Sequence, residues 1–180
     1  LFHHLRTQAD AVMVGAGTVR EERYGRMTKN DDLREKRANE GLVPDALAVV
    51  KHVSRMGEVA IVSDGDTDYQ PRKIANAGLA EAVGHQDVLI FTHKQESLHH
   101  VTERLPGCHY VMVDDKESVL ADAEKVLGER LTTVWVKQGH YASDPKYYKK
   151  PDPDITLDRI GELCEYARDD FMGRARGDCE

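Results

Sequence analysis

The sequence predicts an α/β protein in which a parallel, Rossmann-like sheet is covered by helices on both faces, giving three layers. Short runs rich in Val, Ile and Leu alternate along the chain with longer segments of helical periodicity. Several of the short runs end abruptly on polar or charged residues. Because parallel strands joined by right-handed crossovers point the same way, these ends should meet at one edge of the sheet, where ligands bind in such folds.

The composition narrows the function classes. The chain has 180 residues, of which 40% are hydrophobic and 32% charged, as in an ordinary globular protein. The net charge of −7 argues against a nucleic-acid partner, and no apolar run approaches the roughly 20 residues of a membrane span. The cysteines, three in number, lack the spacing of a zinc site or disulfide framework, so we expect a reducing, cytoplasmic location. The chain begins at Leu1, as if within a helix, which suggests a fragment of a longer protein.

In chain order, the first predicted strand is Ala11–Val14, which leads into the turn Gly15-Ala-Gly-Thr18 and a helix from Val19. A strand followed by a glycine-containing turn and a helix presents free backbone N–H groups to a phosphate. A tight turn that binds nothing is the other interpretation of the same residues.

The segment after Pro44 has two interpretations. Its apolar residues recur with helical period as far as Met56, which predicts a helix ended by Gly57. The alternative is a strand over Leu47–Val50. The continuous apolar stripe favours the helix.

The remaining elements follow by alternation. We expect further strands and helices at the following positions: strands 59–62, 88–92, 110–113 and 131–136; helices 33–40, 71–82, 96–105 and 117–128. Ile155–Ala167 is predicted to hold a last strand or helix, and the tail from Arg168 to fray.

The strand at 110–113 ends on two adjacent acids, Asp114 and Asp115. Two neighbouring carboxylates repel each other, so a divalent cation or a basic side chain commonly neutralises such a pair. The other interpretation is a helix N-terminus, where acids are favoured by the helix dipole.

Two further strand ends carry suitable partners for that pair, namely Ser63 and Lys94. A hydroxyl and an ammonium can hold phosphate oxygens while paired carboxylates hold Mg²⁺. Together these residues predict a site for a small phosphorylated substrate.

Residues 44–163 resemble the C-terminal part of the haloacid dehalogenase (HAD) hydrolase superfamily. The motifs that carry the resemblance are Val62-Ser-Asp-Gly-Asp66, Gln70-Pro-Arg-Lys-Ile74, His93-Lys94, His109-Tyr-Val-Met-Val-Asp-Asp-Lys116, Leu131-Thr-Thr-Val134, Gln138-Gly-His-Tyr141 and Thr156-Leu-Asp-Arg-Ile-Gly161. The resemblance implies that Ser63 and Lys94 bind phosphate and that Asp114 and Asp115 bind magnesium. HAD enzymes attack with an aspartate in an Asp-x-Asp turn after the first strand, and no such turn precedes Ser63 here. Without it the covalent aspartyl route is closed.

Residues 1–43 are similar instead to the reductase domain of riboflavin-biosynthesis deaminase/reductases, through Phe2-His-His-Leu-Arg-Thr-Gln-Ala-Asp-Ala-Val-Met-Val-Gly-Ala-Gly-Thr-Val-Arg-Glu-Glu-Arg-Tyr-Gly25. That resemblance implies that Gly15, Gly17 and Thr18 contact NADPH. The chain would then divide into a reductase-like fragment (1–43), a HAD-like core (44–167) and a tail (168–180). A HAD sheet without its first strand has a gap, and unpaired backbone groups in a buried gap are costly. We therefore expect Ala11–Val14 to fill it and restore a five-stranded sheet.

Three functions remain open from the sequence. The first is a magnesium-dependent, phosphatase-like HAD hydrolase that lacks its aspartate nucleophile. The second is a fragmentary NADPH-dependent reductase of riboflavin biosynthesis. The third is a phosphate- or nucleotide-binding module without catalysis. The substrate and the oligomeric state are not predicted.

Overall fold

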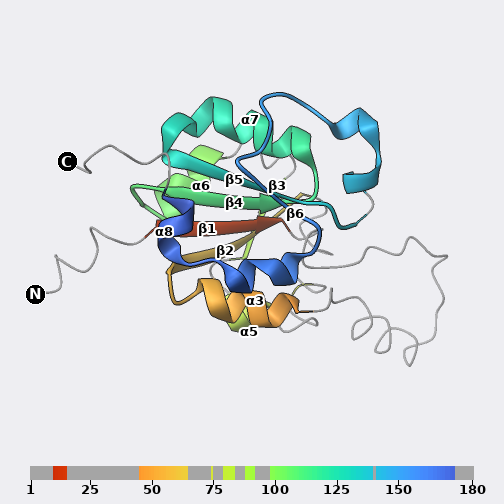
Figure 1. The fold of residues 1–180 in the computed structure, drawn as a ribbon. Helices are drawn as coiled ribbons and strands as arrows, with labels where there is room; N and C mark the ends of the chain where they lie inside the picture. Colours follow the sequence, from red (N-terminus) through yellow and green to blue (C-terminus); the bar gives the residue numbers. More distant parts are fainter. Residues whose placement is uncertain are drawn as a thin grey trace, which may run out of the picture.

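The computed structural model describes residues 10–15, 45–64, 74, 79–83, 88–91, 98–139 and 141–172. These residues form a central sheet with helices on both sides, which confirms the predicted three-layer α/β architecture (Figure 1). Helix α7 (Glu117–Leu127) lies on one side of the sheet, and α3 (Ala46–Val53) lies on the other.

The sheet has six strands in the order β3-β2-β1-β4-β5-β6, and every neighbouring pair is parallel. The strands are β1 (Asp10–Gly15), β2 (Gly57–Asp64), β3 (Val88–Phe91), β4 (Tyr110–Asp114), β5 (Leu131–Val136) and β6 (Ile155–Leu157). All of them therefore present their carboxyl ends at the same edge.

Strand β1 occupies the centre of the sheet. It pairs with β2 on one side, where Val12 is in register with Val59, and with β4 on the other, where Val12 is in register with Val111. The expectation that Ala11–Val14 fills the gap between these strands is thus confirmed. The expected count of five strands is wrong, because Ile155–Leu157 adds β6 beside β5.

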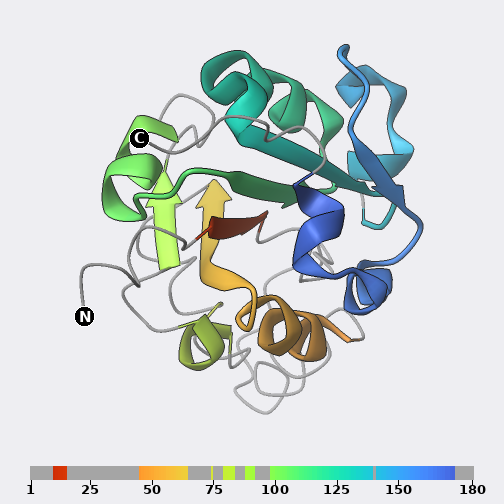
Figure 2. The same ribbon diagram turned by 60° about the vertical axis from the view of Figure 1, so that its left-hand side comes forward.

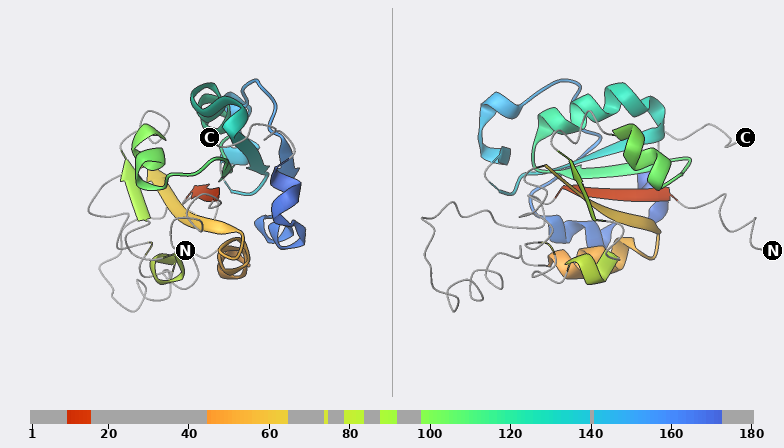
Figure 3. Two further views of the ribbon diagram at one scale, coloured as in Figure 1. Left: turned by 90° about the vertical axis from the view of Figure 1, so that its left-hand side faces the viewer. Right: turned by 180° about the vertical axis from the view of Figure 1, so that it is seen from behind.

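Alternating side chains of β2 and β4 pack into two separate cores, as the two-residue period of a strand requires. On β4, Val111 and Val113 face one core, whereas Tyr110 and Met112 face the other. The first core is covered by α3, α5 (Leu79–Val83) and segments near the C-terminus, and the second by α6 (Leu98–Arg104) and α7. Figure 2 and both panels of Figure 3 show this division of the helices between the faces.

The segment after Pro44 is helical, as the apolar stripe indicated. Helix α3 buries Ala46, Val49, Val50 and Val53 against the sheet, so the strand interpretation is wrong. The helix ends at Val53 rather than at Gly57, which is already the first residue of β2.

The region after β6 is more ordered than predicted. Ile155–Ala167 holds both a strand and a 3-10 helix, η6 (Ile160–Glu165), and a short helix α8 (Arg168–Phe171) follows. Phe171 is only 3% exposed, and its carbonyl accepts a 2.6 Å hydrogen bond from Thr132 Oγ1. The expectation of fraying from Arg168 is therefore wrong for residues 168–172.

Other expectations have mixed outcomes. The strand at 131–136 is confirmed, and the helices at 117–128 and 96–105 are observed as α7 and α6 with shorter bounds. The helix at 33–40 and most of that at 71–82 lie outside the described residues.

Cys108 is disulfide-bonded, contrary to our expectation, whereas Cys164 is free and exposed. Within the described segments, no helix combines the length and apolar character needed to cross a membrane.

Candidate active site at the carboxyl edge

The carboxyl ends of β2, β1 and β4 lie side by side. Gly15, the last residue of β1, is in register with Val62, the neighbour of Ser63, while Val14 is in register with Val113, the neighbour of Asp114. The sheet therefore brings Gly15, Ser63 and Asp114 to one place, with Gly15 in the middle. This juxtaposition is the one that the sequence predicted.

The two adjacent acids are both buried. Asp114 is 1% exposed and Asp115 is 4% exposed. Asp114 Oδ1 accepts a 2.9 Å hydrogen bond from the backbone N–H of Lys116, which begins the turn into α7. The N-cap residue of α7 is Lys116, so neither acid is the N-cap that the alternative interpretation required.

Asp115 is held against the loop after β5. Gly139 has a φ of +96°, and a Cβ added there would lie 2.6 Å from Asp115 Oδ2. Only glycine combines this backbone conformation with such a close approach. On the backbone side, Trp135 Nε1 donates a 3.2 Å hydrogen bond to the Asp115 carbonyl.

The loop that carries Gly139 is fixed by the C-terminal part of the sheet. The Lys137 N–H donates to the Leu157 carbonyl at 2.8 Å, and the Ile160 N–H donates to Gln138 Oε1 at 3.1 Å. Strand β6 and helix η6 thus set the position of Gly139, and Gly139 limits that of Asp115. No role was predicted for Gly139, and the one available signal was a glycine shortly after the end of a strand.

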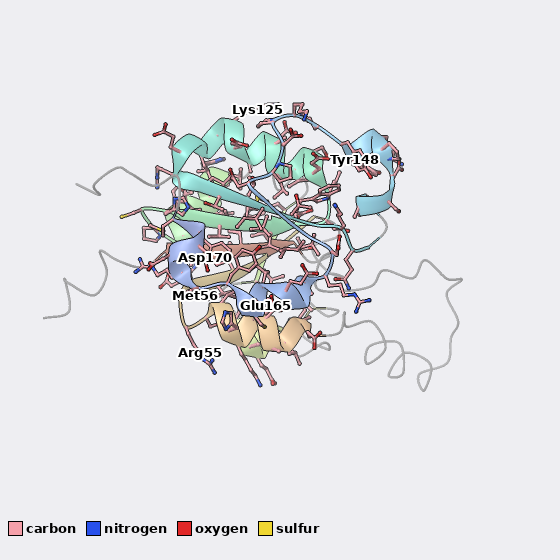
Figure 4. All side chains as sticks on the ribbon, in the orientation of Figure 1. Arg55, Met56, Lys125, Tyr148, Glu165 and Asp170 are labelled. Carbon is pink, nitrogen blue, oxygen red and sulfur yellow. The ribbon has the colours of Figure 1, made fainter. Side chains whose placement is uncertain are left out.

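Residues 141–150 contact Lys116 and Trp135, which adjoin the acidic pair. They contain two 3-10 turns, η4 (Tyr141–Ser143) and η5 (Pro145–Tyr147), and lie at the right of Figure 1, toward which the strand arrows point. Tyr148, labelled in Figure 4, meets the Trp135 ring edge-on with centroids 5.5 Å apart. The segment therefore contacts the residue that bonds to Asp115.

Helix α7 holds the same segment through two acids. Burial, followed by the nearby Asp152, raises the pKa of Glu117, although the Lys149 backbone N–H bonds to the carboxylate and opposes the rise. At Asp122 burial also acts to raise the pKa, but hydrogen bonds from Lys125 and Lys149 outweigh it and lower the pKa overall. Lys149 Nζ lies 2.5 Å from Asp122 Oδ1.

The other predicted site residues have different outcomes. Ser63 is 3% exposed at the end of β2, and Gly15 ends β1, both at the expected edge. Lys94, Gly17 and Thr18 lie outside the described residues. Among the residues that the structure describes, no group of three or more His, Cys, Asp or Glu side chains could hold a metal, and the predicted role of Asp114 and Asp115 as metal ligands stays a prediction.

No protein-family model matches the chain, and no match is found among curated proteins. Among solved structures, a HAD-like hydrolase from Burkholderia xenovorans is 30% identical, and the match covers 88% of this chain and 96% of that one with a TM-score of 0.74. The L-2-haloacid dehalogenase of Xanthobacter autotrophicus with chloropropionic acid covalently bound is 14% identical over 87% of this chain and 97% of that one, with a TM-score of 0.62. The D,D-heptose 1,7-bisphosphate phosphatase of B. bronchiseptica, complexed with magnesium and phosphate, is 13% identical over 87% and 96%, with a TM-score of 0.63. At these identities the last two show the fold alone.

The match to the Burkholderia protein also bears on the N-terminal part. A match over 88% of the 180 residues is longer than residues 44–180, so it includes part of the first 43. Strand β1 belongs to the same sheet, and nothing in the fold or the comparisons supports the reductase-like fragment or its NADPH site. On this evidence, the chain belongs to the HAD-like hydrolases.

Proposed function

We propose that this HAD-like hydrolase acts on phosphate esters at the carboxyl edge of its sheet, with magnesium held by Asp114 and Asp115. The observation that carries the proposal is the burial of two adjacent carboxylates beside Gly15 and Ser63. An acidic pair at the carboxyl end of a parallel strand lies where ligands bind in sheets of this kind.

The donor set fits magnesium. Mg²⁺ prefers oxygen ligands and is commonly bound through one or two carboxylates together with waters and substrate phosphate oxygens. Asp114 and Asp115 supply such carboxylates from one strand end. When bound, the ion would neutralise charge on the phosphate oxygens.

The chain's own residues would divide the remaining work. Ser63, at the end of β2, would donate its hydroxyl to a phosphate oxygen, and Lys94, by resemblance, would supply a positive charge. The backbone N–H groups that follow Gly15 would face the same phosphate.

The attacking group is where this chain departs from its family. Gly15-Ala-Gly-Thr18 follows β1 and contains no carboxylate. Asp10 begins β1 in register with Gly57, at the opposite edge of the sheet. An aspartyl-phosphate intermediate on the turn that follows β1 is therefore excluded. The group that attacks the phosphate would instead be water, or Asp64 or Asp66, which follow Ser63 in sequence.

The test is magnesium-dependent hydrolysis of p-nitrophenyl phosphate by the wild type, Asp114→Asn and Asp158→Asn. Asp158 is an exposed acid whose side chain is 84% accessible, so it is a matched charge control. We expect turnover that requires magnesium, is lost in Asp114→Asn and is unchanged in Asp158→Asn. Turnover that survives in Asp114→Asn would overturn the proposed metal site.

A second candidate is a phosphate-binding module without catalysis, and the absent nucleophile favours it. Its signature would be magnesium-dependent phosphate binding by calorimetry with no hydrolysis of any ester. No observation favours the reductase.

A further inference from the structure

Lys116 differs from the other lysines around the proposed site. The lysines of residues 137–150 each lie against a carboxylate: Lys137 with Asp158, Lys146 with Asp144, Lys149 with Asp122 and Lys150 with Asp152. Lys116 forms no ion pair with an acid of the described segments. Its ammonium group is thus left for another anion.

Two tyrosine rings hold this ammonium in place. Lys116 Nζ lies 4.9 Å from the centre of the Tyr147 ring and 5.5 Å from that of Tyr141. The two rings meet edge to face, with centroids 5.0 Å apart. Contact with aromatic faces stabilises a cation and leaves its hydrogens free to donate.

The cluster lies at the edge that the proposed function assigns to the substrate. Lys116 directly follows Asp115, and the two tyrosines come from the segment after β5, the strand next to β4. Lys116 is partly buried, so an anion that reaches it would meet a charge partly shielded from water.

We propose that Lys116, oriented by Tyr141 and Tyr147, binds a carboxylate on the substrate, so that the preferred ligands are phosphate esters of small hydroxy acids. This inference rests on the proposed function for the position of the phosphate. The cluster selects the substrate by a charge-assisted hydrogen bond outside the reacting group.

A matched pair of ligands tests the proposal. 3-Phosphoglycerate and glycerol 3-phosphate share a phosphate ester and differ where a carboxylate replaces a hydroxymethyl group. Their dissociation constants would be measured by calorimetry with magnesium present, for the wild type, Lys116→Met, Lys116→Arg and Lys146→Met. Methionine keeps the packing against the rings and removes the charge. Lys146 is a matched control, because its ammonium lies 4.6 Å from the Tyr147 ring centre but is paired with Asp144.

We expect the wild type to prefer 3-phosphoglycerate and Lys116→Met to bind it roughly ten- to a hundredfold more weakly, with glycerol 3-phosphate little affected. Lys116→Arg should retain the preference, and Lys146→Met should match the wild type. Equal affinity of the wild type for both ligands, equal weakening of both by Lys116→Met, or binding of neither would overturn the inference.

Hydrolysis of both ligands, followed in the same samples, separates this inference from the proposed function. A preference that depends on Lys116 without release of phosphate would support the inference and overturn hydrolysis. Release of phosphate without a preference that depends on Lys116 would support hydrolysis and overturn the inference about Lys116.

Discussion

The two halves of the carboxyl edge are built differently. On the β4–β5 side, Asp115 is confined by Gly139 and bonded through its carbonyl to Trp135, and β6 and η6 fix the loop that does this. On the β1–β2 side, Gly15 and Ser63 occupy the expected places, but the turn Gly15-Ala-Gly-Thr18 that follows β1 contains no carboxylate. The proposed metal side keeps its supporting contacts, whereas the side where the family places its nucleophile lacks that residue. Binding of metal and phosphate can therefore be separated from bond cleavage by experiment.

The largest expected effect comes from Gly139→Ala, which would break the β4–β5 half. The added Cβ would displace the Asp115 carboxylate, so we expect at least tenfold weaker magnesium activation of hydrolysis, about 1.4 kcal/mol or more. The measurement is the magnesium concentration that gives half-maximal turnover. Gly161→Ala is the control, because its Cβ would lie 2.9 Å from Asp45 Oδ2 and leave Asp115 untouched. Magnesium activation that Gly161→Ala weakens equally would show that the effect is general destabilisation.

Asp154→Ala should destabilise the same half without touching the acids. Asp154 Oδ2 accepts hydrogen bonds from both the N–H and the Oγ1 of Thr133, each at 2.9 Å, and Thr133 is buried. Leaving these groups unsatisfied costs about 1–3 kcal/mol in the free energy of unfolding. Urea denaturation would measure the loss, with Asp152→Ala, at an exposed acid, as the control. Equal stability of the two variants would contradict the role of Asp154.

Ser63→Ala examines the β1–β2 half. If the Ser63 hydroxyl binds phosphate, losing one hydrogen bond should raise KM about two- to tenfold and leave magnesium activation unchanged. Steady-state kinetics at saturating magnesium would measure it. A change in magnesium activation instead would assign Ser63 to the metal.

The smallest effect concerns the pH dependence of stability at Glu117. Its pKa is raised above the ordinary value of 4.5, chiefly by burial, so the folded state binds this proton more tightly than the unfolded state. The stability that the protonated form contributes is therefore fully present below pH 4.5, and it is lost as the pH rises through the folded-state pKa of Glu117. We expect Glu117→Gln to raise Tm slightly at pH 7 relative to the wild type, and this gain to vanish below pH 4.5. A gain in Tm that stays constant with pH would contradict the titration of Glu117.

Local patterns account for what could be predicted from the sequence. The apolar run before Asp114 and the stripe of α3 are periodic signals, and both elements formed as expected. Strand β1 was placed because a parallel sheet cannot leave a buried gap. Gly139 could not be assigned to the site, because its contact with Asp115 depends on β6 and η6, far along the chain. Lys116 was missed for the same reason, since the tyrosines around it follow the next strand.

The central position of β1 also has a consequence for folding. Ala11 pairs with Tyr110, roughly a hundred residues later, and closing contacts of such separation is slow. During synthesis β1 emerges before every other strand and must wait for β4. Until β1 inserts, β2 with β3 and β4 with β5 and β6 are two separate half-sheets, each with an open edge available to a wrong partner. Strand β1 thus completes the edge that carries the proposed site and also joins the two half-sheets into one sheet.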